Sequence, residues 1–105
     1  MPNHPHHVVQ RGHNRDVVFV QSEDYLYYLE ILRTFKRFYG VKVYSWYLIA
    51  NHVHLTLDPG DDPSSLSNLI KRLSGRQTRR VNRLERRTGP LWEGRIKSNP
   101  IYTEK

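Results

Sequence analysis

Polar and apolar residues alternate most clearly between Asn51 and Asp58, where the chain reads Asn-His-Val-His-Leu-Thr-Leu-Asp. This period of two predicts a strand with His52, His54 and Thr56 on one face and with apolar residues on the other. Alternate residues on one strand face lie about 6.5 to 7 Å apart, so the two imidazoles can hold one cation between them. The same pattern also fits an ordinary surface strand whose histidines form local hydrogen bonds.

The chain before this strand predicts a strand, a helix and another strand. Residues 6–11 are expected to be extended and to end in a turn at residues 12–14. Ser22 is a good N-cap, acidic residues follow it, and basic residues precede Gly40. Apolar residues recur at helical spacing between these positions, so the helix should pack one side against a sheet. Residues 41–49 are β-branched and aromatic and predict an antiparallel hairpin with the histidine strand.

A second, long helix is expected over residues 63–87. Its apolar stripe is thin around Gly75 and Gln77, which predicts a weak point or bend. A last strand is expected over residues 91–97. The order strand, helix, hairpin, helix, strand is that of an α+β ferredoxin-like sandwich, an antiparallel sheet with both helices on one face.

Composition narrows the class of protein. A chain of 105 residues is expected to be one domain with a single core. It has no cysteine, so a metal would have to be held by His, carboxylate or amide groups. No apolar run is long enough to cross a membrane and the start lacks the apolar core of a signal peptide. We therefore expect a cytoplasmic protein without a membrane partner.

Positive charge is concentrated in the second helix. The chain has 17 Lys and Arg against 10 Asp and Glu, which gives a formal net charge of +7 and favours a polyanionic partner such as nucleic acid. Residues 71–87 contain one acid, Glu85, so pairing along the helix cannot neutralise the bases. A merely solvated basic face is the alternative. We predict phosphate contacts from Arg72, Arg76, Arg79, Arg80 and Arg83.

Cations outside the long helix are further candidates for contacts with DNA. Trp92 and Arg95 lie where an aromatic plane and a guanidinium could meet a base and a phosphate. Arg11 and Lys97 complete the expected nucleic-acid contacts. A tryptophan in the core is the alternative interpretation of Trp92.

Four blocks of sequence, in this order, resemble a known family. They read His-His-Val-Val-Gln-Arg-Gly-His-Asn-Arg, Asn-His-Val-His-Leu, Arg-Gln-Thr-Arg-Arg-Val-Asn-Arg and Gly-Pro-Leu-Trp-Glu-Gly-Arg-Ile-Lys-Ser. Together, over about residues 6–101, they resemble the REP-associated and insertion-sequence (IS200-like) transposases of the single-tyrosine His-hydrophobic-His (HUH) class.

The resemblance implies a function. In that family two histidines, here His52 and His54, hold a divalent ion, magnesium or manganese, which polarises a scissile phosphate in single-stranded DNA. A tyrosine attacks this phosphate and leaves a 5′-phosphotyrosine link. The resemblance also implies single-stranded or hairpin DNA as the partner and a homodimer as the assembly.

One departure from the family pattern affects catalysis. The family's tyrosine lies on a helix after the Trp-Glu-Gly-Arg block, whereas this sequence ends at Lys105. Tyr102 alone among the seven tyrosines follows the histidines, and it has too little scaffold around it to be a good nucleophile. The expectation is a truncated member that binds metal and DNA but does not cleave unless another chain supplies the tyrosine. A second departure is Ala50, where relatives often have proline.

Two other function classes stay open at this point. The first is a non-catalytic basic module that binds nucleic acid without using its histidines. The second, a histidine-triad nucleotide hydrolase, needs a further histidine along the strand, where this chain has Thr56 and Asp58.

Overall fold

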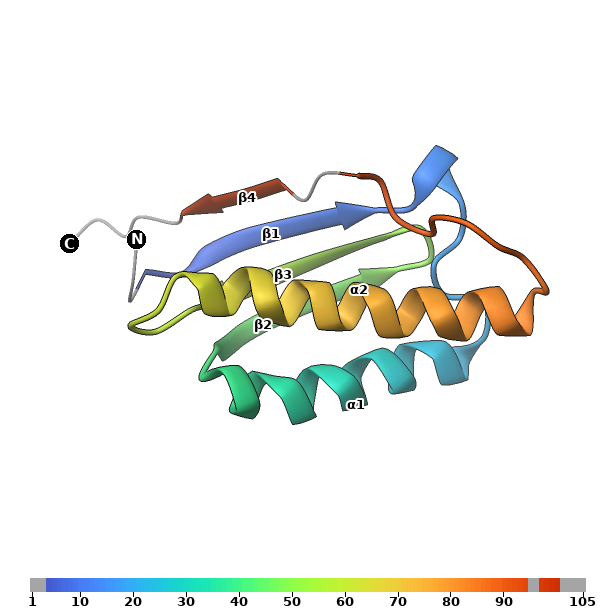
Figure 1. The fold of residues 1–105 in the computed structure, drawn as a ribbon. Coiled ribbons are helices and arrows are strands. Elements are labelled where there is room, and N and C mark those ends of the chain that lie inside the picture. Colours follow the sequence, from blue (N-terminus) through green and yellow to red (C-terminus); the bar gives the residue numbers. More distant parts are fainter. Residues whose placement is uncertain (1–3, 95–96, 101–105) are drawn as a thin grey trace.

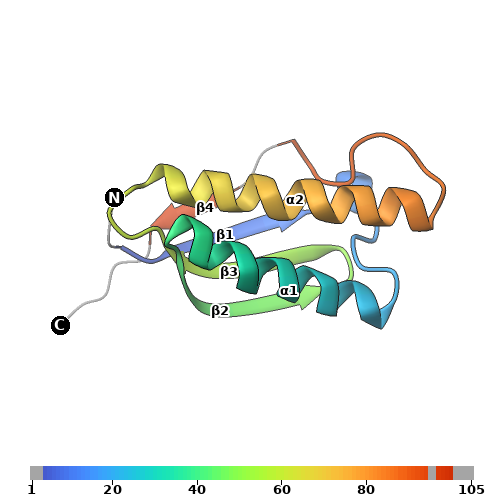
Figure 2. The ribbon, with the colours of Figure 1, turned by 60° about the horizontal axis from the view of Figure 1, so that its bottom comes forward.

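One antiparallel sheet of 4 strands, in the order β2-β3-β1-β4, carries both helices on a single face (Figures 1 and 2). The computed structural model describes residues 4–94 and 97–100. The elements are β1 (His6–Arg11), the 3-10 turn η1 (His13–Arg15), α1 (Ser22–Tyr39), β2 (Lys42–Ile49), β3 (His52–Asp58), α2 (Ser64–Leu84) and β4 (Lys97–Pro100). The predicted α+β sandwich is confirmed.

The two faces of strand β3 differ in burial. Val53, Leu55 and Leu57 point toward the helices and are at most 1% exposed. They pack with apolar residues of α2, such as Leu69 and Leu73, in one core. Because side chains alternate along a strand, the polar residues of β3 face the other way. Within residues 4–94 and 97–100 no helix covers that side, which we call the open face.

A buried carboxylate joins the two helices. Gln21, and not Ser22 as predicted, is the N-cap of α1, and Asp24 completes a capping box with it. The Asp24 Oδ2 accepts hydrogen bonds from the backbone N–H groups of Val20 (2.7 Å) and Gln21 (2.9 Å). Its Oδ1 accepts one from Nε of Arg80 on α2 (2.8 Å). Asp24 is fully buried, so these three donors take the place of water around its carboxylate.

Helix α2 is continuous and shorter than predicted. The expected bend at Gly75 and Gln77 does not occur. Gln77 is fully buried, and its Nε2 donates to the carbonyl oxygen of Val18 (2.7 Å). This polar residue therefore belongs to the core. The helix ends at Leu84, and two residues later Arg86 has a φ of 52°, which right-handed helix cannot accommodate.

The segment after α2 also departs from prediction. Residues 91–94 form no regular strand; Trp92 makes an isolated bridge with Gly12, and β4 begins only at Lys97. Trp92 is 7% exposed and its Nε1 donates to the carbonyl oxygen of Ser74 (3.3 Å). This burial favours the core interpretation of Trp92 over base stacking.

Replacing Trp92 with phenylalanine is therefore expected to lower the free energy of unfolding by about 1 to 2 kcal/mol, through lost volume and the lost bond to Ser74. Urea denaturation measures this directly. Trp46→Phe is the matched control, because Trp46 is 54% exposed. Unchanged stability of Trp92→Phe together with weaker binding of single-stranded DNA would show that Trp92 contacts DNA and does not stabilise the core.

Candidate metal centre and nucleic-acid surfaces

The open face brings three histidines together. In the strand register His52 lies opposite Arg11 of β1, and His54 lies opposite Tyr47 of β2. The third histidine, His7, comes from β1 and shares the face with Arg11 because the two are four residues apart on one strand. His7 was not among the residues predicted from the sequence. The signal was present, since residues 7, 9 and 11 alternate with the buried Val8 and Gln10.

The two predicted metal ligands are held side by side. The ring centroids of His52 and His54 are 5.0 Å apart and their planes are 75° apart. Nδ1 of His52 is 2.8 Å from Oδ1 of Asn51, and Nδ1 of His54 is 3.2 Å from Nε2 of His7. Within residues 4–94 and 97–100, neither Nε2 has a hydrogen-bond partner. Metal-binding histidines are commonly arranged this way, with one ring nitrogen oriented by a neighbour and the other available.

The donor set fits a cation in part. Two imidazoles can ligate a divalent ion, and Mg²⁺ in particular often takes only one or two protein ligands and completes its shell with water and phosphate oxygens. Among the residues that the structure describes, no group of three or more His, Cys, Asp or Glu is placed to hold a metal. The pair alone could therefore supply only part of a coordination shell.

The electrostatics of the open face favour a neutral His54. Its pKa is lowered from 6.5 by burial, and the charges of His52, His7 and Arg11 lower it further. A neutral imidazole is the form that can bind a metal, because protonation removes the lone pair.

A hollow of about 510 Å³ opens beside His52, and its wall also includes Arg11, Gly12, Arg15, Asn51 and Glu93. Gly12 is required there, because a Cβ at this position would lie 2.1 Å from the carbonyl oxygen of Asp16. Sequence reasoning missed Arg15, Asn51 and Glu93. They reach the hollow from three separate segments, which only the fold brings together.

The basic side chains of α2 form two rows along the helix. Arg72, Arg76 and Arg80 face α1, where the first two lie 4.8 and 5.7 Å from the ring centroid of Phe35. Arg80 lies 4.8 Å from the ring of Tyr27 and is also the partner of Asp24. These three predicted phosphate ligands thus take part in packing the helices together.

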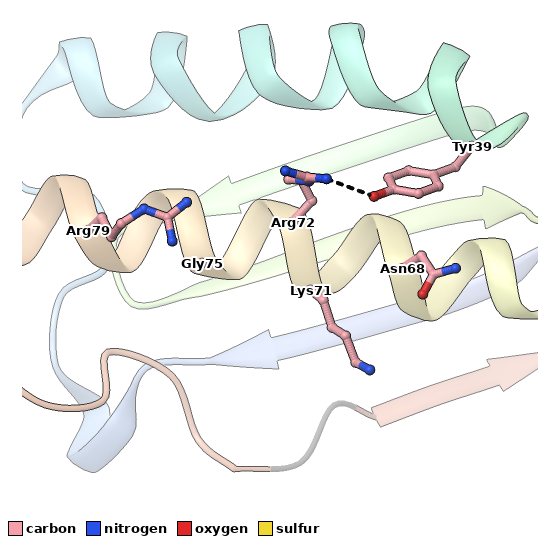
Figure 3. A pocket seen from close by; sticks show the side chains of 6 residues that line it. All are labelled: Tyr39, Asn68, Lys71, Arg72, Gly75 and Arg79. Carbon is pink, nitrogen blue, oxygen red and sulfur yellow. Dashed lines mark hydrogen bonds between the residues drawn. The ribbon is translucent and has the colours of Figure 1, made fainter.

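In the other row, Lys71 and Arg79 line a basic groove together with Arg72 of the first row. Figure 3 shows the groove, of about 320 Å³, lined by Tyr39, Asn68, Lys71, Arg72, Gly75 and Arg79. Arg72 donates to the hydroxyl oxygen of Tyr39 (3.4 Å) at its edge. Arg83 lies one turn beyond Arg79 and is exposed. Helix α2 covers one face of the sheet (Figures 1 and 2), and the histidines lie on the other face because they alternate with the buried residues of β3. The predicted DNA contacts therefore fall on two faces of the molecule.

The remaining predicted residues lie near the end of the chain. Lys97 is in β4, where its backbone pairs with Val9. Arg95 and Tyr102 lie outside the described residues. No helix in the described part of the chain is long and apolar enough to span a membrane.

Comparison with known proteins shows which family and which solved structures this chain resembles. A family model described as "Transposase IS200 like" matches residues 1–99. Among curated proteins, no sequence matches this chain. A REP-associated tyrosine transposase, solved bound to a REP hairpin, superposes with a TM-score of 0.73 at 14% identity; the match covers 99% of this chain and 59% of the other. A transposase candidate from Deinococcus radiodurans R1 superposes with a TM-score of 0.69 at 22% identity, over 93% of this chain and 78% of the other.

Proposed function

Because the chain belongs to the IS200-like transposase family, we propose that it is a metal- and DNA-binding domain of the single-tyrosine HUH class, with His52 and His54 as the ligands of Mg²⁺ or Mn²⁺. The observation that carries the proposal is the pair of imidazoles on the open face, each with Nδ1 engaged and Nε2 available. The chain spans 59% of the REP-associated transposase, so the activity of that whole protein is here a proposal.

The residues around the pair suit a phosphodiester. His52 and His54 would hold a cation that, once bound, polarises a non-bridging phosphate oxygen and stabilises the charge that grows on it. Arg11 lies beside His52 in the register, and Arg15 lines the same hollow. Both guanidiniums can bind neighbouring phosphates and fix the strand in place. Single-stranded DNA fits an exposed sheet face that carries Tyr47, an aromatic residue 64% exposed.

Two tyrosines, Tyr102 and Tyr47, are the candidates for the nucleophile. Tyr102 lies outside the described residues, and Tyr47 is the tyrosine beside the histidines, with ring centroids of Tyr47 and His54 6.2 Å apart. Tyr47 lies on β2 and not on a helix such as the one on which the family carries its tyrosine, so we expect no 5′-phosphotyrosine link at this residue.

The test is to incubate the chain with labelled hairpin DNA bearing a single-stranded flank and Mn²⁺, and to look for a covalent adduct on a denaturing gel. DNA binding without an adduct agrees with the proposal. An adduct lost in Tyr102→Phe or in Tyr47→Phe would identify the nucleophile and overturn the expectation that cleavage needs another chain. Sedimentation with and without the hairpin tests the homodimer that the family resemblance implies.

Single-stranded DNA bound along α2 is expected to contact Lys71, Arg79 and Arg83. Replacing Lys71, Arg79 and Arg83 with glutamine is expected to reduce the slope of log affinity against log salt by about 2, since each phosphate contact to a single strand contributes about 0.7. Fluorescence anisotropy at several salt concentrations measures this.

The matched control removes the same charge elsewhere, with Arg33, Lys36 and Arg37 of α1 changed to glutamine. These residues border a different groove, between α1 and β2. Equal losses of slope in the two triple variants would show that net charge, and not contact with α2, drives binding.

The alternative of a non-catalytic nucleic-acid module has one observation in its favour. The basic residues belong to α2, which covers one face of the sheet (Figures 1 and 2), whereas His52 and His54 alternate with the buried residues of β3 and so lie on the other face. DNA affinity in EDTA separates the two candidates. If a cation links the histidines to a DNA phosphate, the affinity for DNA falls when EDTA removes the divalent ion. If the chain is a non-catalytic module that binds DNA without its histidines, the affinity is the same with and without EDTA.

A further inference from the structure

His7 contacts His54, one of the proposed metal ligands, and has no role so far. Its Nε2 lies 3.2 Å from Nδ1 of His54, and the two rings are nearly parallel, with planes 16° apart and centroids 5.2 Å apart. The two residues are 47 positions apart in sequence and meet because β1 and β3 are adjacent strands.

A hydrogen bond between two neutral imidazoles has two possible directions. If Nδ1 of His54 donates, Nε2 of His54 keeps its lone pair and is free to bind a cation. If instead Nε2 of His7 donates, the proton of His54 is on its own Nε2, and that nitrogen cannot be a ligand. The direction of this one bond therefore decides whether His54 can act as the proposed function requires.

The other proposed ligand, His52, indicates which direction of the His54–His7 hydrogen bond leaves both Nε2 atoms able to bind one cation. Asn51 Oδ1, an acceptor, lies 2.8 Å from Nδ1 of His52, so the neutral His52 carries its proton on Nδ1 and keeps the lone pair on Nε2. A pair in which both Nε2 atoms are unprotonated needs the same arrangement at His54. His7 is the acceptor that the structure places there.

We propose that His7 is a positioning residue, whose Nε2 accepts the Nδ1 proton of His54 and so presents the Nε2 lone pair of His54 to a divalent cation. The proposal rests on the proposed function for the identity of the ligand, but the direction of the bond is a property of the protein alone. Such partners are worth about 10- to 100-fold in metal affinity.

The first test reads the tautomer without any metal. Long-range ¹⁵N–¹H spectra of the histidine rings at pH 7.5 report which nitrogen of His54 carries the proton. We expect the proton on Nδ1 in the native chain. A native His54 protonated on Nε2 would overturn the proposal, whatever the chain does with metals.

The second test measures Mn²⁺ affinity from the free-ion electron paramagnetic resonance signal. His7→Leu removes the acceptor and is expected to weaken binding about 10- to 100-fold. His7→Gln offers an amide oxygen in place of Nε2 and is expected to recover most of that loss. His13→Leu, at an exposed histidine in η1, is the matched control and should bind as the native chain does.

The outcomes separate this inference from the proposed function. Native chain that binds no Mn²⁺ rejects the metal site, whereas the ring spectra still decide the role of His7. Equal Mn²⁺ affinity in the native chain and in folded His7→Leu would overturn the positioning role while leaving His52 and His54 as ligands. Loss in His7→Leu without recovery in His7→Gln would also overturn it, since packing and not the acceptor would then be at work.

Discussion

A chain with both His52→Ala and His54→Ala is expected to lose Mn²⁺ affinity by more than about 100-fold. Removing only a hydrogen-bonding partner of a metal ligand costs about 10- to 100-fold, and the loss of both ligands should cost more. In the described residues no group of three or more potential ligands is placed to hold a metal, so we expect no second site there to replace the pair. Isothermal calorimetry with Mn²⁺ is the measurement.

This double variant should still fold. Both side chains lie on the open face, while the strand is held by Val53, Leu55 and Leu57 in the core. Thr56→Ala, on the same face of the same strand, is the matched control and is expected to bind Mn²⁺ like the native chain. Unchanged affinity in the double variant would remove both histidines from the list of ligands.

Asp24→Ala is expected to lower the free energy of unfolding by about 3 kcal/mol, the largest effect on stability that we predict. The substitution leaves the backbone N–H groups of Val20 and Gln21 and the Nε of Arg80 without their acceptor. Asp16→Ala is the control: its carboxylate pairs with Arg87 at 3.6 Å and is 50% exposed, so we expect a loss of less than about 0.5 kcal/mol. Similar losses in the two variants would show that the buried pair does not stabilise the helices.

The contribution of Asp24 also depends on pH. Burial alone would raise the pKa of Asp24, but hydrogen bonds from Gln21, Arg80 and Val20, with the charge of Arg80, outweigh it and lower the pKa below 3.8. A carboxyl with a lowered pKa stabilises the folded state fully above its unfolded value, and this stabilisation is lost as the pH falls through the folded value. The stability difference between the native chain and Asp24→Ala should therefore be constant near neutral pH and shrink below about pH 3.8. Urea denaturation across that range measures it.

The features that sequence could predict are those with local, periodic signals. The alternation around His52 and His54 put both imidazoles on one face because a strand has a strict period of two. The helices followed from apolar residues at helical spacing. With strands and helices in that order, few topologies remain, and the antiparallel sheet with two helices on one side was among them.

The features that sequence could not predict depend on contacts between distant residues. Gln77 read as a weak point in a helix because its partner, the Val18 carbonyl, is 59 residues away. Arg80 read as a phosphate ligand because nothing local shows Asp24, 56 residues away, as its partner. His7 went unnoticed for the same reason: its meeting with His54 follows from which strands are neighbours and from their register.

The most direct measurement is a ¹H–¹⁵N spectrum of the native chain with substoichiometric Mn²⁺, whose unpaired electrons broaden the signals of nearby nuclei. With the cation held between His52 and His54, broadening should be strongest at these residues and at Arg11 and Tyr47, their neighbours in the register. The core side of α2 should keep sharp signals. Broadening centred instead on the acidic loop at Asp61 and Asp62, with the histidine signals unaffected, would contradict the metal site on the open face.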